Sequence, residues 1–134
     1  MCRLLGYVSQ DKQTFNSAVG SDFAEFVTLS SVHCDGWGVA TIDHDKNVAH
    51  ISRAPEAANK RQVFSKTIEA SVSDGALLHL RWATAGLPVS ENNTHPFAYE
   101  DISFIHNGAT YPPAALESVI SPELSPLIQG DTDS

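Results

Sequence analysis

Short runs of apolar residues, bounded by polar or turn-forming residues, predict the strands of this chain. The runs on either side of residues 43–47 flank a polar turn, a pattern typical of a β-hairpin. The run that begins at Ala76 is almost continuously apolar, which favours a strand buried on both faces. The predicted strands are Leu4–Val8, Trp37–Ile42, Val48–Ser52, Ala76–Arg81 and Ile102–His106.

Helical spacing of apolar residues predicts three helices between these strands. In the first, Phe23, Phe26 and Val27 recur on one side. Prolines begin the other two, where the fixed φ of proline suits the first turn of a helix. The predicted ranges are Asp22–Ser31, Pro55–Val72 and Pro112–Ile120.

The order of these elements predicts an α+β domain in which helices cover a sheet. Leu87–Asp101, rich in Pro, Asn, Glu and Ser, is expected to be a long loop of the kind that lids a site. No composition shift or repeat divides the chain, so residues 1–134 are interpreted as a single domain.

Composition and charge narrow the classes of partner. The 134 residues are 42% hydrophobic and 18% charged, which is enough apolar material for a core. A net charge of -8 with no basic cluster makes nucleic acid and anionic membranes poor partners. No apolar run approaches the roughly 20 residues that span a bilayer, so a soluble, cytoplasmic protein is expected. In that compartment Cys2 and Cys34 are expected to be free thiols.

Cys2 is a candidate nucleophile because removal of Met1 would give it a free α-amine. An α-amine with a pKa of about 7.7 to 8.0 is a suitable base for a thiol with a pKa of about 8.5. One residue would then supply both nucleophile and base. The alternative is that Cys2 is an ordinary small apolar residue of the first strand.

Two strand ends carry further candidate chemistry. Arg81 follows an apolar strand, where a guanidinium needs an anion; a substrate carboxylate and an internal carboxylate are both open. Asn107 and Gly108 follow another strand, and a side-chain N–H next to an unhindered backbone N–H can form an oxyanion hole. The same dipeptide also forms ordinary turns.

The sequence predicts no metal and no cofactor. Among six histidines, only His33 adjoins a cysteine, and neighbouring residues on a strand point apart. Cys34 is interpreted as a buried, inert thiol. His79 is expected to be a hydrogen-bonded core histidine, and His95 either part of a lid or an ordering contact within its loop.

Six motifs, taken together and in order, resemble the class II glutamine amidotransferases, and most closely the stand-alone branch of that N-terminal-nucleophile family. They extend from the first residue to the last. The motifs are Met1 to Tyr7, Asp35 to Val39, His79 to Thr84, Asn93 to Phe97, His106 to Gly108 and Thr132 to Ser134.

The resemblance implies a fold and a reaction. The fold would be a four-layer αββα sandwich, and a chain of this length would be its N-terminal part, a fragment lacking later helices and strands. Cys2 would attack the γ-amide carbon of glutamine, or of a γ-glutamyl compound, and release ammonia. Asn107 and Gly108 would be the oxyanion donors.

The resemblance also implies how the substrate is held. Arg81 would bind the α-carboxylate and Asp133 the α-ammonium, while Trp82 and Thr84 would line the pocket. The ammonia would pass to a synthase partner or to solvent. The alternative function is a catalytically silent domain that binds a γ-glutamyl ligand or serves as a scaffold; retention of Met1 would favour it.

Overall fold

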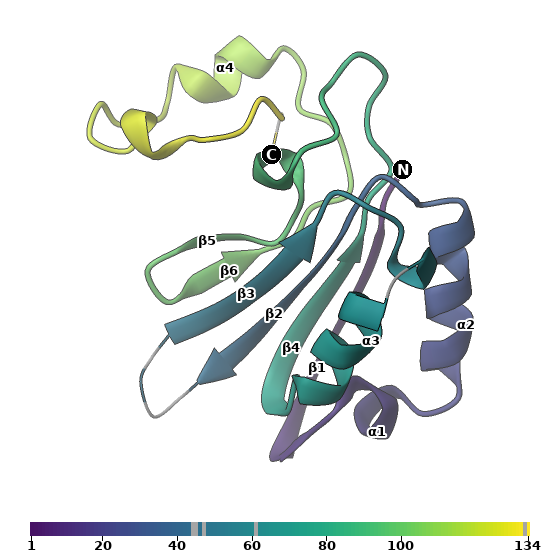
Figure 1. Cartoon of the computed structure of the whole chain (residues 1–134). Coiled ribbons are helices and arrows are strands. Elements are labelled where there is room, and N and C mark those ends of the chain that lie inside the picture. Colours follow the sequence, from purple (N-terminus) through teal and green to yellow (C-terminus); the bar gives the residue numbers. More distant parts are fainter. Residues whose placement is uncertain (44–45, 47, 61, 133) are drawn as a thin grey trace.

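The computed structural model describes residues 1–43, 46, 48–60, 62–132 and 134. Its centre is a four-stranded antiparallel sheet with the strand order β1-β4-β2-β3 (Figure 1). The strands are β1 (Arg3–Gln13), β2 (Trp37–Asp43), β3 (Val48–Ala54) and β4 (Ser73–Leu80). A second, two-stranded sheet consists of β5 (Phe97–Tyr99) and β6 (Ile102–Phe104).

The register of the central strands brings distant parts of the sequence to one end of the sheet. Leu80, the last residue of β4, pairs with Arg3 of β1 on one side and with Trp37 of β2 on the other. One residue further on, the backbone N–H of Arg81 donates to the carbonyl oxygen of Gly36 at 2.8 Å. The residues that flank these strands are therefore fixed beside one another by the sheet.

Helices cover one face of the sheet. They are α1 (Phe15–Val19), α2 (Asp22–Thr28) and α3 (Gln62–Ala70), and Figure 1 shows them on the same side. Alternate residues of the strands point toward them, because side chains alternate across a strand. The resulting core contains Phe15, Phe23, Trp37, Val39, Ala58, Phe64, Ile68, Ala76, Leu78 and Leu80.

The opposite face of the sheet is also apolar. Leu4 and Val8 alternate with the core residues of β1 and are 39% and 91% exposed. Near the end that carries Arg81, this face is covered by the segment that leads into β5. There the His95 ring contacts the ring of His79, with centroids 4.5 Å apart and the two planes tilted by 33°.

The remaining elements are short. The helix α4 (Pro113–Glu117) precedes the C-terminal segment. Four 3₁₀ turns are η1 (Leu29–Ser31), η2 (Ala58–Lys60), η3 (Glu91–Asn93) and η4 (Ser125–Leu127).

The structure confirms the α+β class and most of the expected elements. All five predicted strands are present, with β1 longer than expected and the last strand ending at Phe104 instead of His106. The predicted hairpin is β2 and β3; residues 44, 45 and 47 of its turn lie outside the described residues. The helix predicted over Asp22–Ser31 ends as the 3₁₀ turn η1.

Three predictions about elements are corrected. The helix expected from Pro55 begins only at α3, because the chain first turns to bury Ala57 and Ala58, which are 3% and 2% exposed. Leu87–Asp101 contains η3 and β5, and is therefore not wholly a loop. The helix α4 ends at Glu117, short of the expected Ile120.

Candidate functional site

A cavity of about 460 Å³ opens at the end of the sheet where β4 stops. It brings together six of the seven residues predicted for the site. Asp133, the seventh, lies outside the described residues, while its neighbours Thr132 and Ser134 line the cavity. The six predicted residues that line it are Cys2, Arg81, Trp82, Thr84, Asn107 and Gly108.

Cys2 lies directly before β1 and faces the backbone of Trp82. The N–H of Trp82 donates to Sγ at 3.4 Å, and Sγ lies 3.6 Å from the Trp82 carbonyl oxygen. With Met1 attached, the nitrogen of Cys2 is an amide, so a free α-amine requires removal of Met1, which is 82% exposed.

Arg81 is a buried cation with spare hydrogen-bonding capacity. Its side chain is 4% exposed, and Nη2 donates to the Pro88 carbonyl oxygen at 3.1 Å. Nη1 is buried and has no hydrogen-bond partner among the residues that the structure describes. Burial lowers the pKa of Arg81, and the nearby Asp35 and Cys2 oppose this effect. A guanidinium in this state is suited to an incoming anion.

Asp35 fixes the backbone that follows Arg81. Its Oδ2 accepts the N–H of Ala83 at 2.8 Å, and its own N–H donates to the carbonyl oxygen of Arg81 at 3.2 Å. Asp35 lies in one of the six motifs, yet the sequence alone predicts no role for it. The structure assigns it to the support of residues 81–83.

Asn107 and Gly108 follow His106, whose position is fixed by two side chains from elsewhere. His79 Nε2 lies 3.0 Å from the His106 carbonyl oxygen, and His106 Nδ1 lies 2.9 Å from Ser134 Oγ. His79 is fully buried, as predicted for a hydrogen-bonded core histidine.

The loop after Arg81 also contributes to the cavity, through Leu87, Asn93 and His95. Asn93 is 1% exposed; its Nδ2 donates to the Pro88 carbonyl oxygen at 3.1 Å, and its Oδ1 accepts the N–H of Asp131 at 2.7 Å. His95 also lines the cavity, between the rings of His79 and Phe97. The contact with Phe97 is the ordering contact predicted within the loop, and the contact with His79 ties the loop to the sheet.

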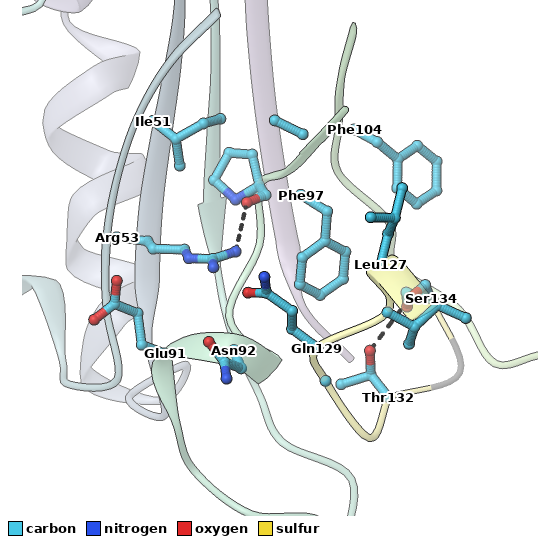
Figure 2. Close-up of a pocket in the computed structure, with 14 residues that line it drawn as sticks. Ile51, Arg53, Glu91, Asn92, Phe97, Phe104, Leu127, Gln129, Thr132 and Ser134 are labelled. Carbon is cyan, nitrogen blue, oxygen red and sulfur yellow. Dashed lines mark hydrogen bonds between the residues drawn. The ribbon is translucent and has the colours of Figure 1, made fainter. Parts of the chain in front are cut away.

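A second cavity, of about 530 Å³, adjoins the first and shares Thr132 and Ser134 with it. Figure 2 shows the side chain of Arg53 among the residues that line this second cavity. Arg53 Nη1 donates to the carbonyl oxygens of Thr94 and Pro96, both at 3.1 Å. These two hydrogen bonds attach the segment that leads into β5 to strand β3.

Cys34 corrects one prediction, because its side chain is exposed and not buried. The neighbouring His33 takes the inward position and is 3% exposed. Both Cys2 and Cys34 are free thiols, as expected. In the described part of the chain, no three His, Cys, Asp or Glu residues are grouped so that they could hold a metal. No helix there is long and apolar enough to cross a membrane.

Comparison with known proteins gives a consistent result. A family model of the class-II glutamine amidotransferases matches residues 1–134. A glutamine–fructose-6-phosphate aminotransferase (isomerizing) of Pectobacterium atrosepticum is 40% identical over 115 residues, which are 81% of this chain and 16% of that protein. Its Vibrio cholerae counterpart is 34% identical over 115 residues, with the same coverage. The probable glutamine amidotransferase DUG3 of Saccharomyces cerevisiae is 33% identical over 108 residues, covering 75% of this chain and 30% of that protein.

The α+β domain thus places a cysteine and a buried arginine at the ends of adjacent strands, beside one cavity. The chain belongs to the class II glutamine amidotransferases. It spans 16% of the length of the aminotransferases and 30% of DUG3.

Proposed function

We propose that this domain hydrolyses the γ-amide of glutamine, or of a γ-glutamyl compound, through a thioester on Cys2. The observation that carries the proposal is that Cys2 and the partly unsatisfied Arg81 line the same cavity as Asn107 and Gly108. A nucleophile, a carboxylate-binding group and two candidate oxyanion donors are thus available to one small substrate.

In the first half of the reaction, the α-amine of Cys2 takes the thiol proton and Sγ attacks the γ-carbonyl carbon. The side-chain N–H of Asn107 and the backbone N–H of Gly108 stabilise the negative charge on the carbonyl oxygen, each by on the order of 100-fold in rate. The C–N bond then breaks, and the ammonium of Cys2 gives its proton to the departing nitrogen. Ammonia leaves a γ-glutamyl thioester.

In the second half, the α-amine accepts a proton from water as the water oxygen attacks the thioester carbon. The same two donors stabilise the second tetrahedral intermediate. The C–S bond breaks, the proton returns to sulfur, and glutamate is released.

Recognition of the substrate depends on opposite charges at its two ends. Arg81 binds the α-carboxylate through its fork of N–H donors, and Asp133 binds the α-ammonium. Trp82, which is 48% exposed, and Thr84 line the pocket beside them. A γ-glutamyl conjugate carries the same two ends, so both substrate classes fit the proposal.

The fate of the ammonia is part of the proposal. Two of the relatives are named as aminotransferases that use glutamine and fructose 6-phosphate. By analogy, the ammonia released here passes to a synthase partner or to water.

We also propose that β5 and β6 belong to the second sheet of an N-terminal-nucleophile αββα sandwich, of which residues 1–134 form part. The support is the apolar character of the sheet face away from the helices, where Val8 is 91% exposed. A sheet with two apolar faces needs a layer on each of them.

The test is glutamate release from glutamine by protein whose loss of Met1 has been verified by intact mass. A second assay treats the same protein with a reactive glutamine analogue, a diazo-ketone that alkylates an activated cysteine. We expect one adduct on Cys2, and loss of both adduct and activity in Cys2→Ala. Cys34→Ala is the matched control, since Cys34 is the other free thiol of the chain, and it should retain both.

Two results would contradict the proposal. One is folded, Met1-processed protein that neither releases glutamate nor forms an adduct. The other is an adduct that moves to Cys34 or persists in Cys2→Ala.

A further inference from the structure

His79 connects the central strand of the sheet to the segment that carries the candidate oxyanion donors. It lies on β4, two residues before Arg81, and pairs with Leu4 of β1 and Gly38 of β2 on its two sides. Its ring reaches the His106 carbonyl oxygen, 27 residues further along the chain, at 3.0 Å. A residue held by strands on both sides has little freedom to move, so it can act as a fixed reference point for the less regular segment that it contacts.

The contact determines where the proton of His79 lies. A carbonyl oxygen only accepts hydrogen bonds, so Nε2 must carry the hydrogen and donate it. Nδ1 is buried and has no partner among the described residues, so it carries no proton in the neutral ring. Burial lowers the pKa of His79 to about 4, which keeps the ring neutral at physiological pH.

The His106 carbonyl oxygen, at the other end of this hydrogen bond, determines how the backbone runs from His106 to Gly108. The oxygen that accepts the hydrogen bond belongs to the peptide unit that joins His106 to Asn107. Because a peptide unit is planar, holding its oxygen fixes the rotation of the whole plane, and with it the Cα of Asn107. His106 itself leaves no room at position 108, where a Cβ would lie 2.6 Å from its Nε2.

We propose that His79 is a positioning residue for the proposed glutaminase reaction: its Nε2–H, donated to the His106 carbonyl oxygen, holds Asn107 and Gly108 in the geometry that stabilises the oxyanion. This inference rests on the proposed function. The oxyanion exists only in the transition states and tetrahedral intermediates. Loss of the contact therefore lowers kcat and leaves KM for glutamine nearly unchanged.

The variants separate hydrogen bonding from packing. His79→Leu removes the donor at similar volume, while His79→Gln offers an amide N–H at a position close to that of Nε2. We expect His79→Leu to lower kcat by on the order of 100-fold, as displacement of reacting groups by about 1 Å does. We expect His79→Gln to recover most of that loss. Leu78→Val is the matched control, because Leu78 is equally buried on the same strand but packs into the core on the helix side.

The kinetic result overturns the inference in three cases. In the first, His79→Leu keeps its kcat; in the second, kcat falls equally in His79→Leu and His79→Gln; in the third, kcat falls as much in Leu78→Val as in His79→Leu. A rise in KM with constant kcat also overturns it.

A second measurement does not depend on activity. Nitrogen NMR of histidine-labelled protein should show His79 protonated at Nε2, and His79→Leu should shift the amide signals of Asn107 and Gly108 but not those of α3. Unchanged Asn107 and Gly108 signals overturn the inference even if the wild-type protein is inactive. Inactive wild-type protein with the expected signals contradicts the proposed function, and with it the catalytic part of the inference, while it supports the contact by which His79 holds Asn107 and Gly108.

Discussion

Arg81 shows how a single residue can be costly for the fold and useful for a site. Its guanidinium is buried, and Nη1 has no partner in the described chain. A cation in that state is destabilising, since part of its hydration is lost without replacement. The carboxylate of the proposed substrate would restore the missing interactions. We therefore expect Arg81 to matter for substrate binding and not for the stability of the fold.

We therefore predict that Arg81→Met separates binding from stability. KM for glutamine should rise by roughly 10-fold or more, because a hydrogen bond to a charged group contributes about 1.5–3 kcal/mol. The free energy of unfolding should change by no more than about 1 kcal/mol, since an apolar side chain of similar length replaces a buried charge.

Steady-state kinetics and urea denaturation of the same Arg81→Met sample measure the two effects. An unchanged KM together with a large loss of stability would make Arg81 a structural residue instead.

At the scale of elements, the contact between β2 and the segment before β5 is unusually close. Gly38 lies against this segment, and a Cβ added there would collide with the His95 carbonyl oxygen and would lie 2.6 Å from Pro96 Cδ. Only glycine lets the wall of the cavity pack directly on the sheet at this point.

We predict that Gly38→Ala displaces residues 93–96 and lowers the free energy of unfolding by about 1–3 kcal/mol, as other overpacked substitutions do. Glutaminase activity should fall as well, because this segment forms one side of the cavity. Gly75→Ala is the matched control in the neighbouring strand, where the added Cβ would meet only Ile42 Cδ1 at 3.5 Å.

Urea denaturation and glutamate release compare the two alanine variants. Equal effects of Gly38→Ala and Gly75→Ala would show that glycine is needed in these strands for backbone reasons and not for the close approach.

At the scale of the whole molecule, two neutral histidines couple the fold to pH. Burial lowers the pKa of His79 to about 4 and that of His95 to about 3. At His79 the hydrogen bond to the His106 carbonyl oxygen opposes this lowering of the pKa, while the charges of Arg81 and His106 add to it. At His95 the charges of His79, His106, Arg81 and Arg53 all add to the lowering of the pKa. In the unfolded chain both should titrate near 6.5, so the unfolded state binds more protons below that pH.

Stability from these two histidines is therefore present above pH 6.5 and is lost as the pH falls toward their folded pKa values. We predict that each steepens the decline of the unfolding free energy by about 1.4 kcal/mol per pH unit in that window. Urea denaturation between pH 7 and pH 4 measures the slope, which should be smaller in His95→Phe.

Phe97→Leu is the control for this experiment, because Phe97 contacts the His95 ring and carries no titratable group, so its loss can lower stability but should leave the slope unchanged. A slope in His95→Phe equal to that of the wild type would contradict the assignment.

The sequence predicts the sheet well because each strand has its own apolar run. It misses α1, whose five residues bury only Phe15 and so show no period. It misses β5, which is three residues long and lies within a polar stretch. Short elements of this kind are stabilised by tertiary contacts that local pattern does not record.

The same limit applies to the site. Cys2, Arg81 and Asn107 could be named as candidates because the chemistry of each is visible in its own motif, and the structure brings them to one cavity. Their catalytic and binding roles stay proposals. Two supporting hydrogen bonds could not be predicted, because their partners are far apart in sequence. Asp35 and Ala83 are 48 residues apart, and His79 and His106 are 27 residues apart. Only the folded register shows them as neighbours.

Cys2 and Arg81 lie at the ends of adjacent strands, so the sheet influences which length of substrate can contact both residues. Neighbouring strands are held about 4.8 Å apart by their hydrogen bonds. The spacing between the backbones of Cys2 and Arg81 is therefore set by strand pairing and not by a loop. Under the proposed roles, with the α-carboxylate on Arg81, we expect glutamine to bring its amide carbon closer to Sγ than asparagine, whose side chain is one methylene shorter.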